Sequence, residues 1–214
     1  MALMIKRFEF NMFGETTYIV WDSVSLDAAI VDAGMSDATE CHVIDSFIEQ
    51  NHLTIKYLLN THVHLDHAFG IPHASERYGV KLSASPLDAP LAERIEQQAV
   101  MFHLPIKPSN VLIENELHDG DTISLGKEHL KVIEVPGHTP GGLAFHSPDN
   151  KFVLTGDSLF HSSIGRTDLP GGNHSTLIHS ITGRLLTLPP DTKVYPGHGP
   201  ATTIGHELRY NPYL

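Results

Sequence analysis

Short apolar runs separated by turn residues dominate the first 60 positions of the chain. Three runs rich in β-branched and aromatic residues come first, with Asp and Ser residues between them, and they predict a meander of strands over 5–13, 16–21 and 28–31. Apolar residues at helical spacing then predict a surface helix over 37–52. The next run, 55–59, has the length and composition of a short buried strand.

The later part of the chain continues this alternation of strand and helix patterns. We expect a hairpin where Asp119-Gly120-Asp121 splits the runs 111–118 and 122–125, because Asp-Gly pairs favour tight turns between strands. The order of strands, helix, strands and helix predicts an α+β protein with two strand-rich halves. The other expected elements are helices over 68–78, 86–102 and 175–188 and strands over 80–84, 130–135, 151–155 and 192–195.

Four side chains that can bind metal follow the buried strand 55–59 within one short segment, Thr61-His62-Val63-His64-Leu65-Asp66-His67. In an extended backbone alternate side chains share a face, so His62, His64 and Asp66 should point one way and His67 another. One loop could therefore address two metal ions. We also expect Asp66 to begin the helix over 68–78, whose positive end would keep this carboxylate ionised.

Three further predicted strands each end in a residue that can bind metal, directly after a glycine. These endings are Pro136-Gly137-His138, Gly156-Asp157 and Pro196-Gly197-His198, and they supply the ligands that the first segment lacks. Imidazole and carboxylate donors without a thiolate suit Zn²⁺, and equally Fe²⁺ or Mn²⁺. Most of the other eleven histidines are expected at the surface or half-buried, without a metal.

Length, charge and cysteine content narrow the class of protein. With 214 residues and 41% hydrophobic residues, the chain is expected to form one domain over 1–214. The net charge of −11 and the lack of a basic cluster exclude a typical nucleic-acid-binding protein, so we expect a small-molecule substrate. The sequence carries no signal for an oligomeric state.

The cellular location is predicted from two features of the sequence. Cys41 is the only cysteine, so no disulfide can form within the chain and a reducing compartment is the simpler inference. No apolar run has the length of a signal peptide or a membrane span. We therefore expect a cytoplasmic protein without a membrane partner.

The segments THVHLDH, VPGHTPGG, TGDSLF and YPGHGP, in this order, resemble the metallo-β-lactamase superfamily of αββα-sandwich hydrolases over about 58–200. SIGRTDLPGGN and TIGHELRYNP resemble its glyoxalase II-like branch, particularly the short bacterial members. Full-length glyoxalase II enzymes continue into a helical region that holds glutathione, whereas this chain ends 16 residues after His198.

The resemblance implies a four-layer αββα sandwich with two divalent metal ions, for which we expect zinc, with iron or manganese possible. It also implies hydrolysis of a thioester, as in hydroxyacylglutathione hydrolases, by a hydroxide that bridges the metals. The implied ligands are His62, His64 and His138 for one metal and Asp66, His67 and His198 for the other, with Asp157 between them.

Two residues are expected to act on the substrate. Asp66 is the candidate to orient the hydroxide or to move its proton. Arg166 lies in a glycine-rich loop after a metal-bearing strand and is the best candidate to bind substrate. The alternative for Arg166 is an ion pair with Asp168 that braces the loop.

Other activities of the same superfamily remain as alternatives. A mononuclear iron persulfide dioxygenase also carries the GRTD segment, but the second metal site is not used there, so His198 is the residue that discriminates. Classical β-lactamases usually differ at Asp157 or His67, which disfavours β-lactam cleavage. A protein that binds metal without catalysis is the third possibility.

Overall fold

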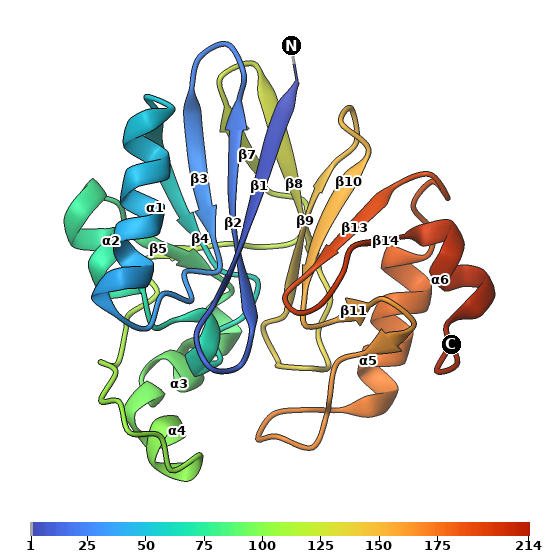
Figure 1. The fold of residues 1–214 in the computed structure, drawn as a ribbon. Helices are drawn as coiled ribbons and strands as arrows, with labels where there is room; N and C mark the ends of the chain where they lie inside the picture. Colours follow the sequence, from blue (N-terminus) through green and yellow to red (C-terminus); the bar gives the residue numbers. More distant parts are fainter. Residues whose placement is uncertain (1) are drawn as a thin grey trace.

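Two six-stranded β-sheets pack face to face, and helices cover the outer face of each sheet (Figure 1). This arrangement comes from a computed structural model that describes residues 2–214. The strand order is β1-β2-β3-β4-β5-β6 in the first sheet and β14-β13-β10-β9-β8-β7 in the second. The predicted α+β class and the four-layer αββα sandwich are confirmed.

The first sheet contains the predicted meander and the strand that precedes the histidine-rich segment. Its first three strands are antiparallel, whereas β3, β4, β5 and β6 run parallel to one another. Its strands are β1 (Leu3–Phe10), β2 (Glu15–Asp22), β3 (Asp27–Val31), β4 (Thr54–Leu59), β5 (Leu82–Ala84) and β6 (Asn115–Glu116), and its helices are α1 (Ala38–Gln50), α2 (Ile71–Tyr78), α3 (Ala89–Ala92) and α4 (Ile95–Met101).

No helix among residues 2–214 is long and apolar enough to span a bilayer.

The second sheet supplies the other three strand endings. The strands are β7 (Thr122–Leu125), β8 (Glu128–Glu134), β9 (Leu143–Ser147), β10 (Phe152–Gly156), β13 (Lys193–Pro196) and β14 (Thr202–Thr203), with β11 (Leu159–Phe160) and β12 (Ser163–Ile164) as a separate ribbon. The helices are α5 (His174–Ser180), which continues as a π-helical stretch over Ile181–Leu185, and α6 (Ile204–Tyr210).

Three hydrophobic cores hold the four layers together. Tyr18 and Val31 from the first sheet meet Phe145 and Leu154 from the second, in the core between the sheets. A second core lies between the first sheet and its helices, and a third lies between the second sheet and α5 with α6. Burial of apolar surface in three places therefore fixes where the sheet edges meet.

The predicted hairpin over 111–125 is wrong. Strand β6 pairs with β5 in the first sheet, while β7 pairs with β8 in the second, so the turn at Asp119-Gly120-Asp121 crosses between the sheets. The reason lies in burial, because Val111 packs in the outer core of the first sheet and Ile123 packs between the sheets.

Two predicted helices have different boundaries in the structure. The helix expected over 68–78 begins only at Ile71, with Gly70 as its N-cap and a proline in its first turn, and Asp66 lies in a separate 3-10 turn, Leu65–His67. The helix expected over 86–102 is divided into a 3-10 turn, α3 and α4. Strand β9 and helix α6 were not predicted.

Candidate metal centre

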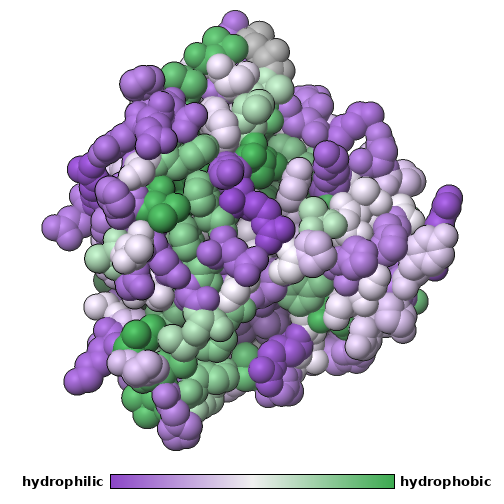
Figure 2. Space-filling view, viewed as in Figure 1, coloured by the Kyte–Doolittle hydropathy of each residue, from purple (hydrophilic) through white to green (hydrophobic). Residues whose placement is uncertain are grey.

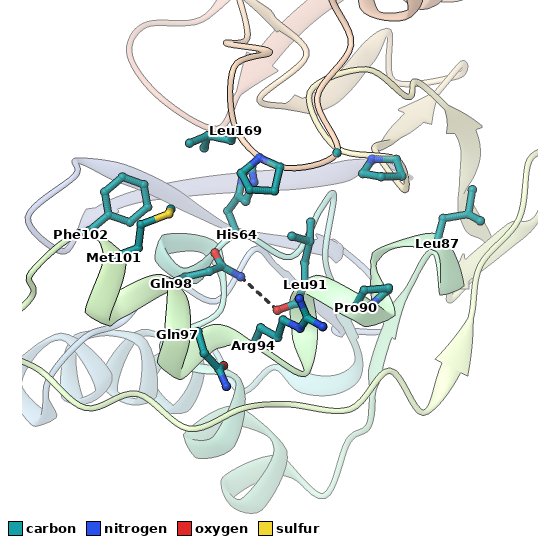
Figure 3. A pocket seen from close by; sticks show the side chains of 13 residues that line it. His64, Leu87, Pro90, Leu91, Arg94, Gln97, Gln98, Met101, Phe102 and Leu169 are labelled. Atoms are coloured by element: carbon teal, nitrogen blue, oxygen red, sulfur yellow. Dashed lines mark hydrogen bonds between the residues drawn. The ribbon is translucent and has the colours of Figure 1, made fainter.

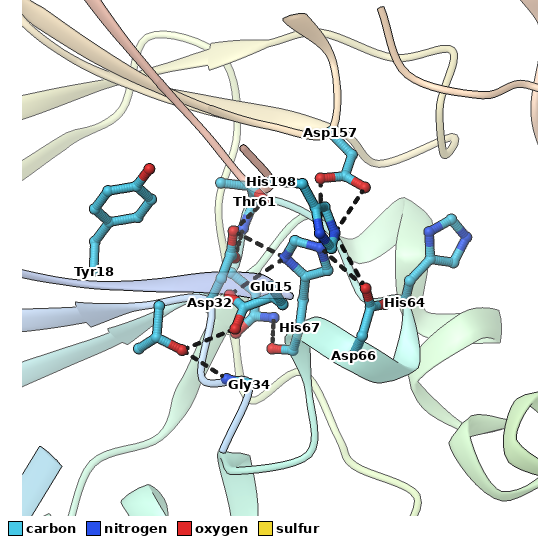
Figure 4. Close-up of polar contacts among 12 residues, drawn as sticks. Glu15, Tyr18, Asp32, Gly34, Thr61, His64, Asp66, His67, Asp157 and His198 are labelled. Carbon is cyan, nitrogen blue, oxygen red and sulfur yellow. Dashed lines mark hydrogen bonds and ion pairs between the residues drawn. The ribbon is translucent and has the colours of Figure 1, made fainter. Parts of the chain in front are cut away.

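Four loops at the carboxyl ends of β4, β8, β10 and β13 meet at one edge of the sandwich. The loop after β4 carries the histidine-rich segment, and the other three carry His138, Asp157 and His198. Figure 4 shows the side chains of Asp66, His67, Asp157 and His198 turned toward one another. The structure thus brings all seven predicted ligand residues to one place.

Glycine at two of the strand endings allows this close approach. A Cβ atom on Gly156 would lie 2.1 Å from Thr61 Oγ1, and the φ of Gly156 is +49°, a value that residues with a side chain rarely adopt. A Cβ atom on Gly197 would lie 2.3 Å from Asp157 Oδ1 and 2.7 Å from His67 Cε1. Any larger residue at either position would push the loops apart.

His62, His64 and His138 form one group, which we call the three-histidine cluster. Their ligand atoms lie within 4.8 Å of one another, and all three side chains are buried. His64 Nδ1 is 2.9 Å from His138 Nε2, and the ring of His62 lies 4.9 Å from that of His64 and 4.8 Å from that of His138. Nitrogen donors therefore converge from three directions.

Asp66, His67 and His198 form the second group, which we call the mixed cluster. Asp66 Oδ2 lies 3.2 Å from His198 Nε2 and 3.7 Å from His67 Nε2. The expectation that Asp66 shares a face with His62 and His64 is wrong, because the 3-10 turn over 65–67 coils the backbone. This turn brings Asp66 beside His67 instead.

Asp157 lies between the two clusters. Its Oδ2 is 3.7 Å from His138 Nε2 in the three-histidine cluster and 3.5 Å from His198 Nε2 in the mixed cluster. Its Oδ1 is 3.5 Å from His67 Nε2. One carboxylate thus faces donors of both groups.

Several of these converging atoms are buried without a hydrogen-bond partner within residues 2–214. They are His62 Nε2, His67 Nε2 and Asp157 Oδ1. Buried polar atoms without partners are costly and rare in proteins, whereas a cation among them would satisfy several at once. The geometry and the donor types fit divalent metal ions.

The far side of two imidazoles, those of His138 and His198, is held by a hydrogen bond to a backbone carbonyl. His138 Nδ1 donates to the carbonyl oxygen of Arg166 at 2.7 Å, and His198 Nδ1 donates to that of Gly14 at 3.2 Å. A carbonyl can only accept, so each Nδ1 carries a proton, and in the neutral ring Nε2 carries the lone pair that a metal would need. Outer hydrogen bonds of this kind orient histidine ligands in metal sites.

Asp32 supports two of the histidines and was not identified from the sequence. Its carboxylate accepts hydrogen bonds from the backbone N–H and the hydroxyl of Thr61, both at 2.7 Å, and its Oδ2 lies 3.2 Å from His67 Nδ1. The Thr61 oxygen in turn lies 3.1 Å from His62 Nδ1. The signal available in the sequence was position, because Asp32 directly follows β3, the strand parallel to β4.

Burial and charge adjust the pKa values of the cluster residues in opposite directions. Burial, followed by the neighbouring His138, lowers the pKa of His64 to about 3, so its imidazole is neutral and its lone pair is available. Burial disfavours charge on His67 as well, but Asp66 and Asp157 raise its pKa well above the usual value. The two carboxylates thus favour the protonated ring of His67, and a divalent cation beside them would take over this positive charge.

Arg166 lies in the wall of a cavity of about 190 Å³ that contains residues from both clusters. Its guanidinium is more than half exposed and donates two hydrogen bonds of 2.7 Å to the carboxylate of Asp168. The bracing ion pair is therefore present in the structure. The backbone carbonyl of the same residue orients His138.

Comparison with known proteins identifies the family of this chain. A sequence model described as the metallo-beta-lactamase superfamily matches residues 13–198. The chain belongs to this superfamily. Among curated proteins, it is similar to the hydroxyacylglutathione hydrolase GloC of Haemophilus influenzae, with 36% identity over 94% of this chain and 93% of that protein. It is also 37% identical to the probable metallo-hydrolase YqgX of Bacillus subtilis over 82% of this chain and 83% of that protein.

Solved structures agree with this assignment to the superfamily. The fold is similar to that of BLEG-1, described as a B3 metallo-beta-lactamase, with a TM-score of 0.89 and 28% identity over 99% of both chains. It also matches TTHA1623 in a di-iron-bound form, with a TM-score of 0.85 and 34% identity over 98% of this chain and 100% of the other. ETHE1 from Myxococcus xanthus gives a TM-score of 0.78 at 28% identity, over 98% of this chain and 83% of the other. The protein is a member of a family of metal-dependent hydrolases.

Proposed function

We propose that this member of the metallo-β-lactamase superfamily is a binuclear hydrolase that cleaves a thioester. The observation that carries the proposal is the position of Asp157 between two complete groups of donors. In this proposal the three-histidine cluster holds one divalent metal ion, the mixed cluster holds the other, and Asp157 is a ligand to both.

Zinc is the proposed metal at both positions. Nitrogen and oxygen donors without sulfur suit zinc, and they also suit iron and manganese. The similarity to TTHA1623, whose structure is described as di-iron-bound, keeps iron as the main competitor. Elemental analysis of the purified protein distinguishes these ions directly.

The chain's own residues position the reaction. When bound, a pair of divalent cations supplies an activated water at neutral pH and a Lewis acid for the carbonyl oxygen. Asp66 lines the cavity and its Oδ2 lies 3.2 Å from His198 Nε2, so we propose that it orients the attacking water and accepts its proton. Arg166, in the wall of the same cavity, is proposed to meet the polar end of the substrate.

A thioester is the proposed substrate class. The named activity of GloC, hydrolysis of a hydroxyacylglutathione, supports this choice, as does the resemblance of the loop that contains Arg166. A thiolate is a good leaving group, so the main chemical requirement is an activated water beside a polarised carbonyl.

The test is hydrolysis of lactoylglutathione, followed by thiol release, with metal content measured on the same sample. We expect about two equivalents of metal per chain and turnover that a chelator abolishes and added metal restores. The His179→Gln variant is the matched control, because His179 is an exposed histidine outside the clusters. One equivalent of metal, or no turnover of any thioester by the fully loaded protein, would contradict the proposal.

A mononuclear iron persulfide dioxygenase is the second candidate, and the similarity to ETHE1 keeps it in view. His198 argues against it, because its ring points into the mixed cluster and its Nδ1 is held by the Gly14 carbonyl. The convergence of ligand-type side chains in the mixed cluster favours an enzyme with two metal ions over one with a single ion. Oxygen uptake with glutathione persulfide, measured on iron-loaded protein, would favour this candidate over the hydrolase.

A further inference from the structure

An apolar cavity of about 320 Å³ lies directly beside the metal centre (Figure 3). One wall is the segment of α3 and α4, and the opposite wall is the turn at Leu169 together with Pro140. Its volume is in the range of pockets that bind small molecules. The side chains that give it its character are Leu87, Pro90, Leu91, Met101, Phe102 and Leu169.

Two of the large apolar side chains that line this cavity are exposed to solvent. Leu87 is 58% exposed and Met101 is 49% exposed. Figure 2 shows hydrophobic surface gathered at the lower left, where Figure 1 places α3 and α4. A contiguous apolar patch that lines a hollow marks a site for an apolar ligand.

The apolar cavity adjoins the cavity of the metal centre. His64, Phe102 and Leu169 line both, and His64 is also a member of the three-histidine cluster. A molecule whose reactive group lies at the metal centre would extend past His64 to reach the apolar cavity. This shared wall favours an occupant that is part of the substrate.

Gln98 is the buried polar side chain of the α4 wall, whereas Arg94 and Gln97, which also line the cavity, are exposed to solvent. Gln98 is already engaged: its Oε1 accepts a hydrogen bond from the Leu65 N–H at 3.0 Å, and its Nε2 donates to the Leu91 carbonyl at 3.0 Å. A polar ligand group placed against Gln98 and its apolar neighbours would lose its hydrogen bonds to water without replacement, which is costly. An apolar group has no hydrogen bonds to water to lose, and the burial of its surface here is favourable.

We propose that this cavity binds an apolar segment attached to the scissile carbonyl, a hydrocarbon chain or an aromatic ring, on either the acyl or the thiol side of a thioester. The proposal rests on the proposed hydrolase function and specifies its substrate class. A short, polar acyl group such as lactoyl leaves the cavity unfilled, so lactoyl thioesters should be poor substrates compared with thioesters that carry a longer apolar chain.

The experiment uses two series of thioesters with the metal-loaded protein, below micelle-forming concentrations. In the first series the thiol is fixed and the acyl group grows from acetyl to octanoyl, and in the second the acetyl group is fixed and the S-alkyl chain grows. We expect kcat/KM to rise roughly fourfold per methylene in one series until the cavity is filled, as the transfer free energy of a methylene predicts. The series that shows the rise tells which side enters the cavity.

Two neighbouring residues of α4 provide a matched pair of variants. Met101 lines the cavity, whereas Val100 is 74% exposed and does not. In the series that shows the rise, Met101→Gln should reduce the ratio of kcat/KM for the longest chain to that for the shortest at least threefold, and Val100→Gln should leave this ratio unchanged. Equal ratios in the two variants and the parent protein would overturn the proposal.

A binding measurement separates this inference from the proposed function. Ketone analogues, in which a methylene replaces the sulfur, cannot be hydrolysed, and calorimetry measures their affinity. Affinity that rises with chain length supports the cavity assignment even if no thioester is cleaved, in which case only the hydrolase proposal fails. Hydrolysis with no dependence on chain length in either series, together with flat ketone affinity, overturns the cavity assignment and leaves the hydrolase proposal intact.

Discussion

The wall that carries the histidines of the metal centre, which we call the inner wall, and the wall of the apolar cavity that is formed by α3 and α4, which we call the outer wall, are built in opposite ways. On the inner wall, the histidines after β4 are buried, and His62 and His67 are each held from behind through Thr61 or Asp32. The outer wall consists of short helical segments with exposed apolar side chains, such as Leu87 and Met101. In the proposed enzyme, the buried inner wall would carry out the reaction, whereas the exposed outer wall would select the substrate.

The two walls are nevertheless joined by buried hydrogen bonds. Asp88, at the start of α3, accepts from the Val63 N–H at 3.1 Å, and Gln98 on α4 accepts from the Leu65 N–H at 3.0 Å. The buried face of the outer segment thus braces the metal-binding loop, while its exposed face lines the apolar cavity. The segment of α3 and α4 therefore has two roles, which can be tested separately.

The largest effect is expected from Asp157→Ala on the inner wall. Loss of an outer hydrogen-bond partner typically costs 10–100-fold in metal-site function, so loss of the residue between both clusters should lower kcat/KM by more than about 100-fold. Metal content should fall as well. Thioester hydrolysis and elemental analysis measure both, and near-normal turnover in this variant would refute the assignment of Asp157 to both metals.

A smaller effect is expected from Asp32→Asn, one layer behind the ligands. The amide keeps the size of the carboxylate but weakens its contact with His67 Nδ1 and its hydrogen bonds from Thr61. We expect metal affinity to fall by about 10–100-fold, measured by competition with a chromogenic chelator. Asp27→Asn, at the opposite end of β3, is the control, and equal affinity in the two variants would show that Asp32 does not support the site.

Gln98→Leu tests the link between the walls. The change leaves the Leu65 N–H buried without an acceptor, which should lower the free energy of unfolding by about 1–3 kcal/mol. The neighbouring Gln97 is exposed, so Gln97→Leu should change it by no more than about 0.5 kcal/mol. Denaturant unfolding of the metal-loaded variants measures the difference, and similar midpoints would show that the outer segment does not brace the loop.

The smallest effect concerns the exposed pair on the loop that faces the outer wall. Hydrogen bonds from Arg166 lower the pKa of Asp168 to about 2 from an ordinary 3.8. Since the folded-state pKa is depressed, the stabilising contribution of the pair is present above the unfolded-state pKa and is lost as pH falls through about 2. NMR titration of the Asp168 carboxyl carbon measures this value, and in Arg166→Gln it should return toward 3.8.

Much of the architecture could be predicted from the sequence because its signals are local. Strand endings that carry Gly-His or Gly-Asp indicated where the sheets converge, and the resemblance in four segments led to the αββα sandwich. Predictions failed where distant packing decided. The runs around Val111 and Ile123 look like a hairpin but are buried in different cores, and pattern alone does not show which core a run will join.

The same limit applies to the candidate site. Ligand-type residues are conspicuous by spacing, but Asp32 looks like an ordinary turn residue because its partners, Thr61 and His67, are far along the chain. The pairing of Asp66 with His67 depends on a 3-10 turn that a periodicity argument does not detect. The apolar cavity was likewise not predicted, since its walls come from segments about 70 residues apart in sequence.

The hydrogen bond from His198 to the Gly14 carbonyl joins residues 184 positions apart, and the Thr16 N–H donates to the Gly197 carbonyl beside it at 2.7 Å. During synthesis the early hairpin therefore cannot meet this partner until residue 198 has left the ribosome. In the proposed binuclear hydrolase, the mixed cluster is completed only at that stage, and nascent chains that stop before residue 198 should capture at most one ion.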